Sequence, residues 1–121
     1  MWTVLFHEDF DPEFQELPTD VRIELLARLQ ALANFGPTLG RPQVDTLSGS
    51  SFANMKELRF DANDGVWRVA FAFDPDRNAI LLTAGDKSGV SEKRFYKKLI
   101  AKANKRYQAH LDRQAAKKEK K

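Results

Sequence analysis

Three strand-like segments in close succession, separated by two tight turns, constrain the fold of this chain more than any other feature. They span roughly residues 52–60, 66–73 and 79–85, and the connections at 61–65 and 74–78 are rich in Asp, Asn, Gly and Pro. Connections this short join antiparallel neighbours, because a parallel pair needs a long crossover. The sequence therefore predicts an antiparallel sheet as the centre of the fold.

The segment before this sheet carries signals for one strand and two helices. Residues 2–6 are an apolar run of strand length. Asp11 and Pro12 predict the N-cap and first residue of a short helix that ends at Pro18, where a second helix begins. That helix should stop at 34–37, and we expect the pair to form a hairpin on the sheet, followed by a loop over 37–51. Four apolar residues recur at helical spacing in the second helix: Val21, Leu25, Leu29 and Leu32.

A strongly basic helix is expected after the sheet, from an N-cap at Ser91 to beyond Tyr107. Residues 87–121 contain 13 Lys/Arg and 3 Asp/Glu, a net charge of +10, whereas residues 1–86 contain 7 and 14, a net charge of −7. This asymmetry favours an anionic partner: nucleic acid, an acidic protein segment or a membrane surface. The alternative is a solvated helix face with a disordered lysine tail.

The predicted fold class is α+β: a small, antiparallel-rich, twisted sheet of about four strands, flanked by an N-terminal helical hairpin and a basic C-terminal helix. With 121 residues, 42% of them hydrophobic, the chain fits one domain over 1–113 and a basic, frayed tail over 114–121. The absence of Cys excludes disulfides and thiolate catalysis and suits a cytoplasmic protein. No long apolar segment or export signal is apparent, so no membrane association is expected.

Side-chain alternation along the central strands predicts a polar cluster. Trp67, Val69, Phe71 and Phe73 share one face of their strand, so Arg68 lies on the other. In the preceding strand, Glu57 and Arg59 lie opposite Leu58 and Phe60. If the bulky apolar face packs on the helices, Glu57, Arg59 and Arg68 emerge together, and Lys87 can reach them from the end of the last strand. A bulge would change this register.

The order of elements, and three segments in particular, resemble the RelE/ParE superfamily of bacterial toxins from toxin–antitoxin pairs. The segments are Phe52–Arg59 with its Glu57-Leu58-Arg59 sequence, Val66–Phe71 with Trp67-Arg68, and Gly85–Gly89 with Asp86-Lys87. They look most like the phage-derived, HigB-like branch, and the similarity covers about residues 2–112. The resemblance implies cleavage of ribosome-bound mRNA without metal or cofactor, through attack of the RNA 2′-hydroxyl on the neighbouring phosphate.

The resemblance also implies roles for individual residues. Arg68 matches the arginine of the family's aromatic–arginine strand pair, Lys87 a basic residue after the last strand, and Tyr96 a tyrosine near the family's C-terminus. Metal-free cleavage needs a base, positive charge on the phosphate and a proton for the leaving oxygen. Glu57 is a candidate base, and Tyr96 or Lys93 a candidate acid. The alternatives are an ion pair of Glu57 with Arg59 or Arg68 that only joins strands, and core packing for Tyr96.

The expected partners are mRNA, the ribosome and a cognate antitoxin, a small helix-turn-helix protein. Cationic residues expected to contact RNA phosphates are Lys56, Lys93, Arg94, Lys97 and Lys98. The two histidines, His7 and His110, lie far apart without a ligand-spacing motif, so no metal site is expected. Two other functions stay open: a non-enzymatic inhibitor of DNA gyrase, as in the ParE branch, and a simple RNA-binding module.

Overall fold

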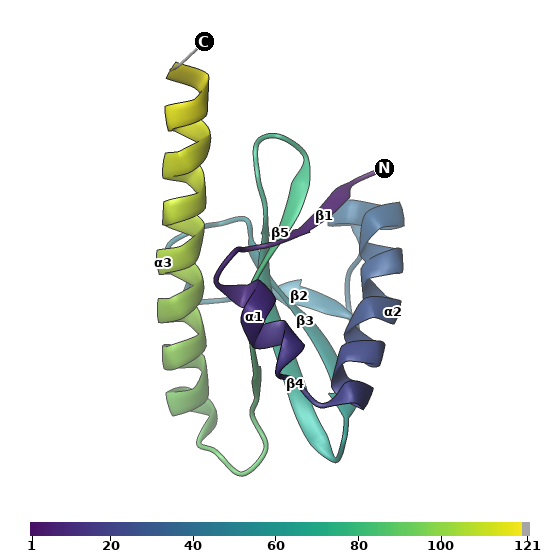
Figure 1. The fold of residues 1–121 in the computed structure, drawn as a ribbon. Helices are drawn as coiled ribbons and strands as arrows, with labels where there is room; N and C mark the ends of the chain where they lie inside the picture. Colours follow the sequence, from purple (N-terminus) through teal and green to yellow (C-terminus); the bar gives the residue numbers. More distant parts are fainter. Residues whose placement is uncertain (120–121) are drawn as a thin grey trace.

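A five-stranded sheet with helices on both faces forms the fold (Figure 1). The computed structural model describes residues 1–119. The strands lie in the order β1-β5-β4-β3-β2. The elements are β1 (Thr3–Phe6), α1 (Phe10–Gln15), α2 (Thr19–Phe35), the 3-10 turn η1 (Gly36–Thr38), β2 (Val44–Thr46), β3 (Met55–Ala62), β4 (Gly65–Phe73), β5 (Asn78–Asp86) and α3 (Glu92–Glu119).

The central strands pair as the sequence predicts, and the edges of the sheet differ from the prediction. β3, β4 and β5 form an antiparallel meander. β1 pairs in parallel with the first half of β5, from Asn78 to Leu81. A fifth strand, β2, pairs with β3 inside the segment predicted to be a loop. Its three residues are too few to show a hydrophobic period, so only the pairing with β3 reveals it.

One face of the sheet packs on α1 and α2 through an apolar core. Val21, Leu25, Leu29 and Leu32 of α2 are buried there, at the spacing that the sequence indicated. α1 begins at Phe10, one residue before the predicted cap at Asp11. The cause is His7, whose main-chain oxygen accepts from the backbone N–H groups of both Phe10 and Asp11. Because of this earlier start, Phe10 is part of the helix, and Phe10 and Phe14, four residues apart, share one buried face.

The other face packs on α3. Phe95, Leu99, Ala103 and Tyr107 are buried at helical spacing against β3, β4 and β5. The helix continues through Glu119, so residues 114–119 are helical and not the frayed tail that was expected; residues 120–121 lie outside the described part. This last turn is held because Gln114 and Lys118 donate to Asp76, in the β4–β5 turn.

A register shift in the β4–β5 pair affects which side chains face α3. Ala70 pairs with Thr83 but Phe71 pairs with Leu81, so Leu82 is the additional residue of a bulge. Leu82 packs in the α3-side core and Thr83 and Gly85 line a cavity beside α3. Gly85 is required for close packing, since a Cβ there would lie 2.8 Å from the Phe95 ring.

Candidate active site

Three polar side chains from three elements meet on the α3 side of the sheet. The Tyr96 hydroxyl donates to Oε1 of Glu57 at 2.7 Å, and Nε of Arg68 donates to the Tyr96 hydroxyl at 3.3 Å. The same Arg68 nitrogen lies 3.3 Å from Oε1 of Glu57. We call Glu57, Arg68 and Tyr96 the polar triad. Residues on β3, β4 and α3 therefore form one hydrogen-bonded unit.

Strand register and helix packing explain why these side chains meet. Arg59 pairs directly with Arg68 across β3 and β4, so Glu57, two residues along β3, lies diagonally next to Arg68 on the same face. On α3, Phe95 packs into the apolar core, which brings its neighbour Tyr96 to the sheet where β3 and β4 carry these polar groups. The predicted side-chain alternation is confirmed, but α3 covers the face that was expected to be open.

Two members of the triad, Glu57 and Arg68, are buried, and Tyr96 is half-buried. Glu57 is 6% exposed and Arg68 is 5% exposed. Arg68 also donates from Nη1 to the Trp67 carbonyl at 2.9 Å. The sequence left open an ion pair between Arg68 and Glu57 as the alternative to a catalytic role. That ion pair is present in the structure. Arg59 does not join it, because its Nη1 lies 3.7 Å from Oδ2 of Asp45 on β2.

A cavity of about 230 Å³ opens beside the triad. Glu57, Arg59 and Tyr96 reach it from β3 and α3, and the rest of its lining is the segment 45–48, which includes the end of β2 next to β3. Sequence reasoning missed this part of the lining, and Asp45 with it, because the segment was predicted to be a loop. A hydrogen bond from Arg41 lowers the pKa of Asp45, so a carboxylate lies beside Arg59 at the cavity.

Tyr96 keeps its proton in this environment. Burial raises the pKa of the phenol, and its hydrogen bond to Glu57 raises it further, while the Arg68 contact works in the opposite direction. A raised pKa means that the hydroxyl is protonated at neutral pH. Tyr96 is therefore a hydrogen-bond donor to the Glu57 carboxylate and not a phenolate.

Lys87 lies near the ring of Tyr96. Its Nζ is 5.9 Å from the centre of the Tyr96 ring and 2.9 Å from Oε1 of Glu92. Its backbone N–H donates to the Val66 carbonyl, which extends the β4–β5 ladder by one residue and fixes its position. The hydrogen bond from Lys87 lowers the pKa of the exposed Glu92. All five predicted catalytic residues thus lie in or next to one region.

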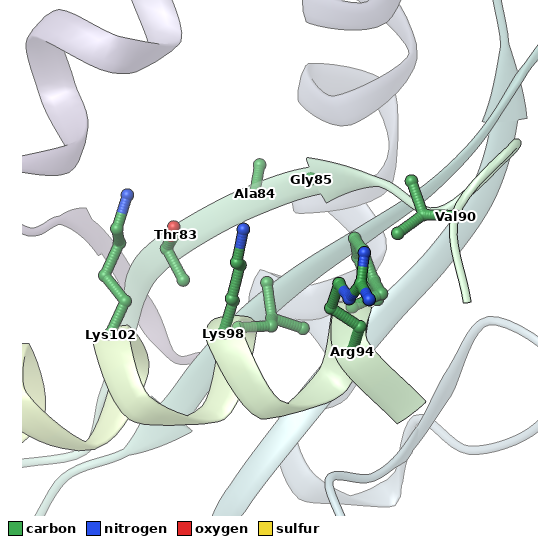
Figure 2. A pocket seen from close by; sticks show the side chains of 9 residues that line it. Thr83, Ala84, Gly85, Val90, Arg94, Lys98 and Lys102 are labelled. Carbon is green, nitrogen blue, oxygen red and sulfur yellow. The ribbon is translucent and has the colours of Figure 1, made fainter. Parts of the chain in front are cut away.

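The predicted RNA-binding residues lie in two places. Lys56 donates to Oγ1 of Thr46 at 3.0 Å, and its pairing with Phe71 places it on the face of β3 opposite to Glu57. Lys93, Arg94, Lys97 and Lys98 are exposed on the first turns of α3. Arg94 and Lys98, together with Lys102, reach toward β5 over a second cavity of about 250 Å³ (Figure 2). Contact of these residues with RNA stays a prediction.

The histidines have structural partners. His7 is buried, and its Nδ1 accepts from the Asp9 N–H at 3.1 Å, at the start of α1. His110 lies 2.9 Å from Oδ2 of Asp74. Within residues 1–119, no three side chains of a metal-ligating type are grouped as a metal would need. None of the helices in the same range has the length and hydropathy of a membrane span.

Comparisons with known proteins identify relatives. Residues 12–108 match the family described as phage-derived protein Gp49-like (DUF891). A protein of Mycobacterium tuberculosis assigned as toxin HigB3 is 46% identical over 77% of this chain and 79% of its own length. A second, assigned as toxin HigB2, is 42% identical over 72% of this chain, which spans only 43% of that relative. The structure of an E. coli toxin RelE mutant in the free state covers 84% of this chain and 95% of its own, with a TM-score of 0.59 and 15% identity, and so shows a shared fold.

Proposed function

This chain belongs to the Gp49-like family and is a HigB-type toxin with the RelE fold, and from this premise we propose that it cuts ribosome-bound messenger RNA. Its action would inhibit translation until a cognate antitoxin neutralises it. The observation that carries the proposal is the convergence of Glu57, Arg59 and Tyr96 on one cavity, with Arg68 directly behind them. Phosphodiester cleavage without a metal needs a base, oriented hydrogen-bond donors and positive charge on the phosphate. A carboxylate, a phenol and guanidinium groups can supply these three functions.

Glu57 is the proposed general base. Both of its contacts within the triad use Oε1, which leaves Oε2 for the hydroxyl of a substrate. The base takes the proton of the 2′-hydroxyl, the 2′-oxygen forms a bond to phosphorus, and the bond from phosphorus to the 5′-oxygen breaks. The products are a cyclic phosphate and a free 5′-hydroxyl. Arg68 and Tyr96 act as positioning residues that hold the carboxylate charged and oriented.

The geometry restricts the identity of the general acid. An in-line displacement places the entering and leaving oxygens on opposite sides of phosphorus. Glu57 and Tyr96 are hydrogen-bonded to each other at 2.7 Å, so the pair serves one side of the phosphate. We infer that Lys87, which is outside this hydrogen-bonded pair with its Nζ 5.9 Å from the centre of the Tyr96 ring, gives the proton to the leaving oxygen once substrate displaces it from Glu92. Lys93, in the first turn of α3 and three residues before Tyr96, is the other candidate.

Arg59 is the proposed phosphate ligand. Its side chain lines the cavity, and its guanidinium can contact two phosphate oxygens at once. Arg59 and Lys87 supply positive charge to the pentavalent phosphate, so the proposed reaction needs no metal ion, and EDTA should leave the cleavage rate unchanged. Lys56 and the basic residues of α3 would hold the flanking RNA phosphates, and this binding should weaken steeply with salt.

The proposal can be tested by mapping mRNA ends in growing cells that express the chain. We expect new ends within translated codons, together with growth arrest. Glu57→Gln should lower the cleavage rate by about 100-fold or more, because it removes the base. Arg59→Ala should lower it by about 100-fold, because charge on the phosphate is no longer stabilised. Arg22→Ala is the matched control: it removes the same charge from α2, and this variant should cleave mRNA as fast as the unchanged chain.

Two outcomes would contradict the proposal. Growth arrest with intact mRNA and gyrase-linked DNA breaks would indicate a ParE-like inhibitor. Salt-dependent RNA binding without new ends, unaffected by Glu57→Gln, would indicate a simple RNA-binding module. Melting curves of each variant separate loss of a catalytic group from loss of the fold.

A further inference from the structure

The sheet has an open edge along the second half of β5. β1 pairs with β5 only as far as Leu81, and β5 continues to Asp86. The Lys87 N–H donates to Val66 on β4. Because the direction of backbone groups alternates along a strand, the N–H and C=O groups of Ala84 and Asp86 point away from β4. Within residues 1–119, neither residue makes a backbone hydrogen bond to a turn, loop or helix.

The fold closes the end of this edge that lies next to β1. Nη1 of Arg106 donates to the Leu82 carbonyl at 2.7 Å, and the same guanidinium binds Glu13 of α1. The unpaired stretch therefore begins at Thr83. Open strand edges pair readily with another extended chain, and proteins usually cover them. Here Arg106 covers the Leu82 carbonyl, whereas the outward backbone groups of Ala84 and Asp86 are left uncovered within residues 1–119.

Cationic side chains flank the open edge at a regular spacing. Arg94, Lys98 and Lys102 follow one another at four-residue intervals on α3, and Figure 2 shows all three reaching toward β5. Among the described residues, Arg94 and Lys98 form no ion pair, and Lys102 lies 4.0 Å from Glu13. Four helical residues advance by about 6 Å. Two residues of an extended strand advance by about 6.7 Å, so alternate side chains of an added strand would meet successive cations.

The cavity between edge and cations has an apolar floor. It measures about 250 Å³ and includes Phe95, Leu99 and Val90, of which Val90 is 47% exposed. The phosphates of an RNA strand could contact the cations. RNA would not form the strand ladder that the outward backbone groups of Ala84 and Asp86 offer, and its phosphates would not pack on an apolar floor. A peptide satisfies all three, because its backbone pairs with both donors and acceptors while its side chains contact the cations and the floor.

We propose that the edge of β5 from Thr83 to Asp86 binds an extended, acidic segment of a partner protein as an additional strand. The side chains of that segment would alternate, with carboxylates facing Arg94, Lys98 and Lys102. Insofar as the partner is the antitoxin, the inference rests on the proposed function. The strand edge itself does not depend on RNA cleavage, since the surface contains none of the polar triad and shares only its cations with the proposed RNA contacts.

The test uses the full chain and a labelled synthetic peptide in which Glu and Val alternate. We expect it to bind and to slow amide hydrogen exchange at Ala84 and Asp86. A peptide of the same composition with its Glu residues grouped in pairs should bind about tenfold more weakly, because its carboxylates no longer match the cation spacing. Equal binding of the two peptides, or unchanged exchange at these amides, would overturn the proposal.

Two variants test the edge and the charges separately. Ala84→Pro removes an outward N–H without removing a bond to β4, so it should weaken peptide binding by about tenfold while Ala84→Ser should not. Lys98→Glu should weaken binding by about fivefold, and the matched reversal Lys117→Glu, far along α3, should not. If single-stranded poly(U) slows exchange at the same amides as the peptide does, the strand edge binds RNA and the proposal is wrong. Cleavage by Ala84→Pro, measured in parallel, reports on the nuclease proposal independently.

Discussion

The two faces of the sheet are both covered by helices, but they are buried by different chemistry. On the α1/α2 face, the buried cluster is apolar throughout, from Phe10 on α1 to Phe71 on β4. On the α3 face, the apolar core occupies only the middle of the contact between α3 and the sheet, and polar groups lie at both ends. The polar triad lies at one end, and Asp74 with His110 lies at the other.

This difference indicates what each face contributes. Apolar burial stabilises the fold directly, whereas a buried ion pair gains little over an apolar pair of similar size. The pair of Glu57 and Arg68 is therefore not explained by stability alone. Its position beside a cavity supports a role in chemistry, and the four predictions below test the contrast between the two faces.

The largest expected change in stability comes from the apolar face. Phe71 is fully buried in the α1/α2 core. Phe71→Ala should lower the free energy of unfolding by about 3–5 kcal/mol, because it leaves a cavity. Urea denaturation measures this, and mRNA cleavage per folded molecule should be unchanged. A loss below about 1 kcal/mol would show that this face is not closely packed.

The polar triad should respond differently to single and double replacement. Arg68→Ala should lower the free energy of unfolding by about 3 kcal/mol and abolish cleavage, because Glu57 stays buried without its partner. Replacing both residues, Glu57→Leu with Arg68→Met, should restore most of the stability but none of the cleavage. If the double variant cuts RNA, the triad is a structural strut only.

A smaller effect is expected at Tyr96. Tyr96→Phe removes two hydrogen bonds, one to Glu57 and one from Arg68, and should cost about 2 kcal/mol of stability. Cleavage should fall further than this stability change explains, since Glu57 loses a donor that orients it. Phe73→Leu, a change of similar stability cost on the apolar face, is the control and should leave the cleavage rate intact.

The smallest effect is a pH dependence at the far end of the α3 face. Burial raises the pKa of Asp74, but hydrogen bonds from His110, Asn78 and Gln114 outweigh it, and the pKa lies below its usual value. A depressed pKa stabilises the fold above the unfolded value of about 3.9, and this contribution is lost as the pH falls through the folded value. Asp74→Asn should therefore flatten the acid limb of the stability curve, measured by urea denaturation at several pH values below about pH 4.

Residue periodicity predicted the parts of the fold that depend on local pattern. The three central strands, the spacing of Val21 to Leu32 and the shared face of Glu57 and Arg68 were all evident, because alternation and helical repeats report which side chains face inward. The polar cluster was found in this way, and the resemblance to RelE/ParE toxins, with Trp67-Arg68 and Asp86-Lys87, is confirmed by the relatives.

Features that depend on long-range packing were not predictable. Nothing local indicates that α3 covers the face of Arg68, so its burial and its pairing with Glu57 became apparent only in three dimensions. β2 escaped detection because Val44–Thr46 is stabilised by β3 and not by its own pattern. The bulge at Leu82 likewise arises from the β4–β5 pairing and carries no signal in the sequence.

Arg106 has a consequence for how the molecule unfolds. Its guanidinium joins three layers at once: it extends from α3, donates to the Leu82 carbonyl of the sheet at 2.7 Å, and binds Glu13 of α1 at 2.5–2.8 Å. Two hydrophobic cores separated by a sheet could otherwise melt one after the other. With this link intact, heating should give a single calorimetric transition whose enthalpy equals the van't Hoff value. Arg106→Met should split or broaden that transition, because it removes the link between α3 and α1.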